Sequence, residues 1–204
     1  MFVSKGFYRE FSKSILKLVF AGVVIGVTHQ YDIAIALILV LIIARNLHKN
    51  IERKDDFNKI AVIGMIITGV LGVVVEYWGV TNEYWSYHNL SNGRSFPYWL
   101  PFAWMLAFSY LYIIEKKILK FLRNKNLRNK ISIIILVATV FPVLGEIITI
   151  NLGVWTYYWP YQILGIPMYA VFGLLTLHMF VNLILVIICK RFKIEDPIFT
   201  LKTI

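Results

Sequence analysis

The sequence predicts an all-α polytopic membrane protein with six transmembrane helices, and three observations support this fold class. Of the 204 residues, 59% are hydrophobic and the mean hydropathy is +0.70, whereas soluble domains are about 45–50% apolar. Long stretches without any charged residue recur along the chain. All but one of the 21 Lys and Arg residues fall in the two terminal segments or in alternate connections between these stretches, which is the charge distribution of a protein that crosses a membrane repeatedly.

The apolar stretches define the elements in chain order. A membrane helix needs roughly 20 apolar residues, and the runs 60–80, 96–114, 131–154 and 163–189 meet this length. Ahead of them, two shorter runs at 15–28 and 33–44 are separated by the polar sequence HQYD. We interpret the two short runs as a helical hairpin, with a single long tilted helix as the alternative.

The charges favour the hairpin and set the orientation. Basic residues cluster before residue 18, in the connections 45–59 and 116–130, and after residue 189, and Arg94 alone lies in another connection. The positive-inside rule then places both termini in the cytoplasm of a cell-membrane protein. A five-helix arrangement would put the basic N-terminus outside. We therefore interpret the run 116–130 as a topology signal, and expect no nucleic-acid partner.

The chain is expected to form a single membrane domain, 1–204, that contains an internal duplication. An N-terminal hairpin (1–59) precedes two repeat units (60–115 and 131–190), which correspond to helices 3–4 and 5–6. Both units begin with a helix that runs outward, so they would be parallel repeats related by an axis along the membrane normal. A shift of 70 residues superposes four pairs of the same residue type: Glu76 and Glu146, Trp85 and Trp155, Tyr87 and Tyr157, and Pro97 and Pro167.

Glu76 and Glu146 are the candidate catalytic residues. Each lies near the outward end of a long apolar run, and carboxyl groups within membrane helices are costly and usually functional. The structural alternative is that they only reach the membrane interface or bond between helices. Glu115 stands beside Lys116 at a helix end, and we interpret it as a boundary residue.

The aromatic residues are the candidate substrate-binding groups. All six tryptophans lie in the two repeat units. An aromatic belt at the interface is the structural alternative, but a belt does not require fixed spacing to a glutamate. His178 lies deep in the last run, one helical turn before Asn182, and a packing role is its alternative. The candidate substrate-binding residues are Trp85, Tyr87, Trp104, Trp155, Tyr157 and His178.

These residue types suit proton-initiated chemistry on a hydrocarbon. Desolvation favours the neutral form of a carboxyl group, which can donate a proton, and aromatic faces stabilise cations. Protonation of a carbon–carbon double bond would give a cation that water or a second alkene captures. Such chemistry needs no cofactor and no metal, and we expect neither. Glu76→Gln is expected to abolish product formation while leaving the fold nearly intact.

The same residues resemble a known family. The stretch from Glu76 to Trp104 resembles the carotenoid hydratases of the bisanhydrobacterioruberin hydratase type, at Glu76, Gly79, Val80, Trp85, Tyr87, Pro97, Pro101 and Trp104. The second unit resembles the heterodimeric-type membrane lycopene cyclase domain, at Trp155, Tyr157, Gly165 and Pro167. In that domain an acidic pair follows the proline, whereas this chain has IPMYAVFG. The resemblance covers about 100 residues.

The expected function is the binding of an isoprenoid or carotenoid-like lipid near the outer leaflet, with hydration or cyclisation of a double bond as its reaction. The expected partners are this hydrophobic substrate and the surrounding membrane lipids. The alternative is a non-catalytic membrane protein, either a lipid or small-molecule transporter or a subunit of a complex or oligomer.

Overall fold

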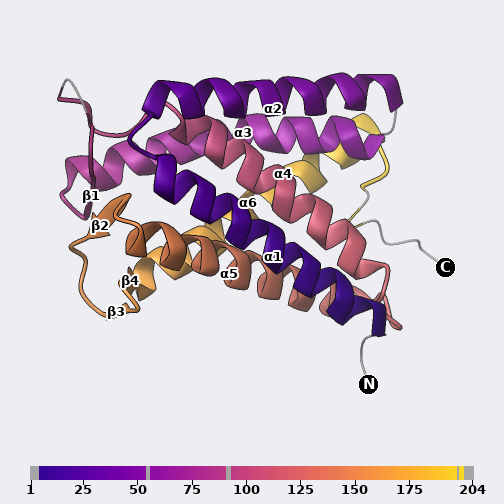
Figure 1. The fold of residues 1–204 in the computed structure, drawn as a ribbon. Coiled ribbons are helices and arrows are strands. Elements are labelled where there is room, and N and C mark those ends of the chain that lie inside the picture. The colour runs from indigo at the N-terminus through magenta and orange to yellow at the C-terminus, as the bar shows by residue number, and fades with distance from the viewer. Residues whose placement is uncertain (1–4, 54–55, 91–92, 197, 200–204) are drawn as a thin grey trace.

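In the part of the chain that the structure describes, six helices form a bundle, and four short strands lie together at one of its ends (Figure 1). The computed structural model describes residues 5–53, 56–90, 93–196 and 198–199. The elements in chain order are α1 (Lys5–Thr28), α2 (Asp32–Arg53), α3 (Asp56–Thr81), β1 (Trp85–Tyr87), α4 (Leu100–Leu119), α5 (Leu127–Asn151), β2 (Trp155–Tyr157), β3 (Gln162–Ile163), β4 (Ile166–Pro167) and α6 (Met168–Phe192). We call the end with the strands the strand end, and the end with both termini the terminal end.

The first two apolar runs are separate helices, as the hairpin interpretation predicted. The amide of Tyr31 donates to the carbonyl of Thr28 over 2.8 Å, which closes a tight turn between α1 and α2. Both helices are longer than their apolar runs, because polar residues extend them at the terminal end. They do not pack mainly on each other: α1 lies chiefly against α5, and α2 against α4.

Four helices are long and apolar enough to cross a membrane, and they contain the segments Gly6–Thr28, Asn58–Thr81, Leu127–Asn151 and Met168–Phe192. The other two described helices, α2 and α4, carry charged residues close to shorter apolar stretches. The chain therefore has the composition and helix lengths of a membrane protein.

The aromatic connections are not irregular loops. β1 pairs antiparallel with β2, and β3 pairs antiparallel with β4. The last helix was expected from residue 163 but begins at Met168, because Leu164 and Gly165, both with positive φ, turn β3 into β4. Two successive left-handed residues are what a tight two-residue hairpin requires. The fourth helix likewise begins at Leu100 rather than at residue 96, with Pro101 in its first turn.

The packed core has two parts. The larger part joins α3, α4, α5 and α6 and is centred on fully buried side chains such as Phe108, Tyr112, Val137 and Phe141. A smaller cluster at the strand end joins α2 to the start of α4 through Leu39, Trp99 and Leu100. Side chains from all six helices leave a cavity within the bundle.

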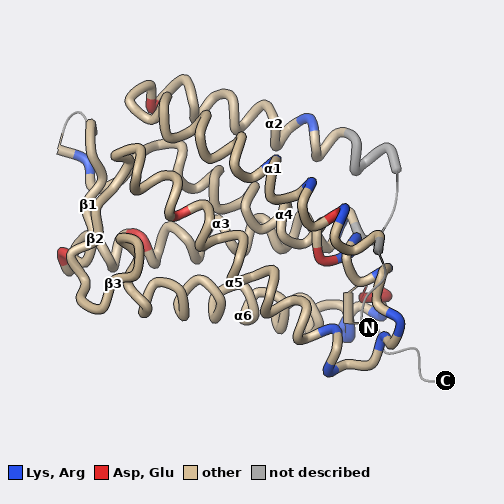
Figure 2. The backbone as a smooth tube through the Cα atoms, turned by 60° about the horizontal axis from the view of Figure 1, so that its bottom comes forward, with Lys and Arg blue, Asp and Glu red and all other residues tan. Residues whose placement is uncertain are grey.

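Most Lys and Arg residues of the described chain lie towards the terminal end (Figure 2). Two of the basic positions, Lys54 and Lys202, lie outside the described residues. At the strand end, Arg94 forms an ion pair with Asp32 at the start of α2, and its guanidinium lies 4.1 Å from the centre of the Tyr98 ring. The one basic residue at this end is therefore neutralised by a nearby carboxylate.

Candidate functional site

Glu76 is a buried carboxyl group that accepts three hydrogen bonds. The indole Nε1 of Trp85 and the hydroxyl of Tyr87 both donate to Oε2, each over 2.9 Å. The indole Nε1 of Trp104, from α4, donates to Oε1 over 3.1 Å. An indole N–H can only donate, so both oxygens of Glu76 act as acceptors. Hydrogen-bond donors that converge on a carboxyl group in this way stabilise negative charge on it.

Two glycines of α3 make room for these indoles. Gly79 lies three residues after Glu76 on the same face of the helix, and an added Cβ there would stand 1.8 Å from the Trp85 ring. Gly72 lies four residues before Glu76, and an added Cβ would stand 2.4 Å from the Trp104 ring. The sequence of α3 thus provides a carboxyl group with a space for an indole on the turn above and on the turn below.

Glu146 on α5 repeats part of this arrangement. The indole Nε1 of Trp155 and the hydroxyl of Tyr157 donate to its Oε2 over 3.2 Å and 3.0 Å. These are the same donor types at the same sequence separations, nine and eleven residues, as around Glu76. The position 70 residues after Trp104 holds Leu174, which has no donor. In the described chain, Oε1 of Glu146 therefore accepts no hydrogen bond.

The two strands interleave the partners of the two glutamates. Trp85 pairs with Tyr157 and Tyr87 pairs with Trp155, with Ser86 opposite Thr156 at the centre. The rings of each aromatic pair approach with centroids 5.6 Å and 5.5 Å apart. Burial raises the pKa of the Tyr87 phenol well above its usual value, and the nearby Glu76 carboxyl adds to the shift. Burial raises the pKa of Tyr157 in the same way, so both phenols remain donors over the physiological pH range.

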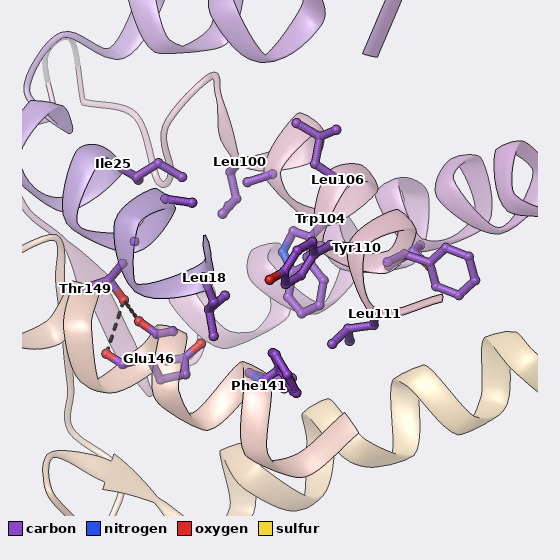
Figure 3. Close-up of a pocket in the computed structure, with 18 of the residues that line it drawn as sticks. Leu18, Ile25, Leu100, Trp104, Leu106, Tyr110, Leu111, Phe141, Glu146 and Thr149 are labelled. Atoms are coloured by element: carbon purple, nitrogen blue, oxygen red, sulfur yellow. Dashed lines mark hydrogen bonds between the residues drawn. The ribbon is translucent and has the colours of Figure 1, made fainter. Parts of the chain in front are cut away.

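The structure brings all eight candidate residues of the sequence to the wall of one cavity of about 520 Å³. Figure 3 shows Leu18 and Ile25 of α1, Trp104 of α4, and Phe141 and Glu146 of α5 around this space. Small-molecule sites commonly measure about 300–1,000 Å³ and combine apolar walls with a few polar groups. The cavity fits that description, because most of its lining side chains are apolar and its carboxyl groups are Glu76 and Glu146.

His178 reaches the cavity wall, but its hydrogen bond goes elsewhere. Its Nε2 lies 2.7 Å from Oε1 of Glu115, and both side chains are buried. The interpretation of Glu115 as a helix-boundary residue is therefore wrong, since its side chain is fully enclosed between α4 and α6. The sequence did not indicate this, because Lys116 and Lys117 follow Glu115 directly and make the segment resemble the polar end of a helix.

Lys17 is a cavity residue that sequence reasoning missed. It was grouped with the basic residues of the N-terminal segment, but α1 begins twelve residues earlier, and Lys17 lies inside the apolar segment Gly6–Thr28. It lines the cavity together with Asn46 of α2 and Thr68 of α3. A charge within an apolar segment was the available signal, and the proximity of other basic residues hid it.

Comparison of the chain with models of known protein families, with curated protein sequences and with solved structures found no match.

Proposed function

We propose that this protein binds a long, unsaturated, isoprenoid-like lipid in the cavity and adds a proton to one of its double bonds. The observation that supports this most directly is that Glu76 and Glu146 open on one apolar cavity and are held by indole and phenol donors. An apolar wall selects a hydrocarbon. The aromatic faces next to the carboxyl groups would stabilise a developing cation.

The difference between the two glutamates suggests their roles. Glu146 has an oxygen that no described residue donates to, so it can hold a proton and face the ligand. Glu76 has donors on both oxygens and is suited to remain a carboxylate. In this scheme Glu146 is the proton donor and Glu76 stabilises the cation.

The proposed reaction balances without a cofactor. The O–H bond of Glu146 breaks as a C–H bond forms, and the π electrons of the double bond supply that new bond. Water then attacks the carbocation, and the proton that the water loses returns to the Glu146 carboxylate. The net change is hydration. If a second double bond captures the cation instead, loss of a proton to Glu146 completes a cyclisation.

The same proposal includes a duplicated architecture with six spans and both termini in the cytoplasm. It is supported by the matching donors of the two glutamates, by the β1–β2 pairing, and by the basic residues at the terminal end.

Thiol labelling in intact cells tests the orientation. An impermeant thiol reagent should label Ile163→Cys but not Lys125→Cys, each in a Cys189→Ala background. Both positions are exposed. Labelling of Lys125→Cys alone would reverse the orientation.

Bound lipid and its conversion provide the direct test of function. The protein would be purified from a bacterial host that makes linear isoprenoid polyenes, and its lipids extracted and analysed by mass spectrometry. We expect a polyene together with a product heavier by one water, or an isomer if the product is cyclic. Glu146→Gln should retain the polyene and form no product. A bound polyene that the wild type leaves unchanged would indicate a carrier, and the absence of any polyene would refute the proposal.

A further inference from the structure

The cavity is long as well as apolar. Along α4 its lining begins at Trp99 and ends at Ile113, which is fourteen residues further on. At a rise of 1.5 Å per residue, this corresponds to about 21 Å, or two thirds of a hydrocarbon layer of about 30 Å. The cavity, with a volume of about 520 Å³, is therefore an elongated channel. Such a shape suits one extended chain better than a broad ring system.

The two ends of this channel differ in their polar groups. Glu76 and Glu146 lie towards the strand end. Lys17 lies towards the terminal end, as the packing of α1 on α5 shows: Gly22 faces Ile148 and Gly26 faces Leu152. This register places the backbone of Lys17 about one turn closer to the terminal end than Glu146. A helical side chain leans towards the N-terminus of its helix, which carries the Lys17 ammonium further in the same direction.

Lys17 and Asn46 are polar residues in the lining of a mostly apolar cavity. Lys17 forms no ion pair with any residue that the structure describes. Asn46 adds an amide to the same cavity wall. Lys17 is exposed and lines the cavity, so its ammonium can bind a ligand there, and its positive charge selects an anion.

We propose that the ligand is a single-chain amphiphile whose anionic group, a carboxylate or a phosphate, binds Lys17. Its apolar chain follows the channel to the two glutamates, where the double bond would lie. This inference rests on the proposed use of the cavity for an isoprenoid-like lipid, and narrows its ligand to an anionic lipid. Repulsion from the Glu76 carboxylate at the strand end and attraction to Lys17 would together fix the direction in which the chain enters.

Tryptophan fluorescence can test this, because Trp85, Trp99, Trp104 and Trp155 line the cavity. The probes are a dibrominated long-chain fatty acid, which quenches nearby indoles, and its methyl ester, which has the same chain without the charge. The protein would be held in discs of zwitterionic lipid. We expect the acid to bind about tenfold or more tightly than the ester, the factor typical of one hydrogen bond to a charged group. A brominated alkyl phosphate distinguishes phosphate from carboxylate, and a preference for either anion supports the proposal.

Variants of α1 identify the residue responsible. Lys17→Gln should abolish the preference for the acid while leaving ester binding unchanged, and Lys17→Arg should retain it. Lys13→Gln is the matched control, because Lys13 is an exposed lysine one turn away that does not line the cavity. Equal binding of acid and ester, or an acid preference that survives Lys17→Gln, would overturn this inference and leave the cavity as a site for neutral lipids. Absence of quenching by every probe would refute lipid binding in the cavity, and with it the proposed function.

Discussion

Trp85 and Tyr157 face each other across the β1–β2 pair with ring centroids 5.6 Å apart, and each donates to a different glutamate. Trp85 bonds to Glu76 and Tyr157 bonds to Glu146. The short sheet therefore does more than join two connections. It fixes the distance and orientation between two carboxyl groups that belong to helices α3 and α5, and it does so with side chains that also line the cavity.

The pairing of β1 with β2 predicts a specific cross-link. Ser86 and Thr156 are directly opposite, and opposed residues of an antiparallel pair have Cα atoms about 4.5–5.5 Å apart, a distance that a disulfide can span. Ser86→Cys with Thr156→Cys, in a Cys189→Ala background, should oxidise to an intramolecular disulfide. After cleavage at a protease site introduced in the α4–α5 connection, the two halves should migrate together on a non-reducing gel. Ser86→Cys with Lys125→Cys should give separate halves, and the same result for the first pair would show that the strands do not pair.

The raised pKa values of Tyr87 and Tyr157 predict a loss of stability at high pH. Above the usual tyrosine pKa of about 10, the phenols ionise in the unfolded chain but stay protonated in the folded one, so the folded state binds more protons and its stability falls as pH rises. The decrease should approach about 1.4 kcal/mol per pH unit for each tyrosine. Chemical unfolding between pH 9 and about 11 would measure it. The double variant Tyr87→Phe and Tyr157→Phe should reduce the slope, and an equal slope in this variant would contradict the assignment.

The helical fold was predictable because its signals are local. A run such as 131–154 has the length and composition of a membrane helix, and the structure has α5 there. The interruption at HQYD likewise indicates a turn from residue type alone. The strands were not predictable, because a three-residue segment such as WSY is extended only through its pairing with WTY, 70 residues away. Neither segment is long enough to show a strand pattern by itself.

The site was only partly accessible from the sequence for a similar reason. The spacing of Glu76 and Glu146 to their Trp and Tyr residues is visible in the sequence, and it predicted that these side chains belong to one site. The hydrogen bond from Trp104 depends on how α4 packs on α3 at Gly72, which no spacing reveals. The pairing of Glu115 with His178 also needs the three-dimensional arrangement, because these residues are 63 positions apart.

The buried contact between Glu115 and His178 predicts a large but recoverable loss of stability. His178→Phe would remove the partner of Oε1, and Oε2 of Glu115 already has no hydrogen-bond partner among the described residues. A buried acceptor left without its partner typically costs about 1–3 kcal/mol, and more where the group is charged. The double variant Glu115→Met and His178→Phe should recover most of this loss, because it replaces both polar groups with apolar ones. Thermal unfolding in detergent would measure the effect, and a double variant as unstable as the single one would show that the contact is not the cause.

The two glutamates should respond differently to the same substitution. In Glu146→Gln, the side-chain carbonyl oxygen can take the place of Oε2 and accept from Trp155 and Tyr157. The side-chain amino group then takes the place of Oε1, to which no described residue donates. Glu146→Gln should therefore fold normally. At Glu76 both oxygens accept from indoles, so Glu76→Gln must place an amino group against a donor. An unsatisfied buried donor costs about 1–3 kcal/mol, which revises the expectation that Glu76→Gln leaves the fold nearly intact. Glu83→Gln, at an exposed position near the end of α3, is the control for a change of charge alone.

If Glu146 is the proton donor, Glu146→Gln should reduce turnover by about 100- to 10,000-fold at unchanged stability. Unfolding curves and product analysis on the same preparations would separate the two effects. Equal destabilisation by both substitutions would mean that the hydrogen bond from Trp104 does not distinguish the sites, and full turnover in Glu146→Gln would exclude Glu146 as the acid.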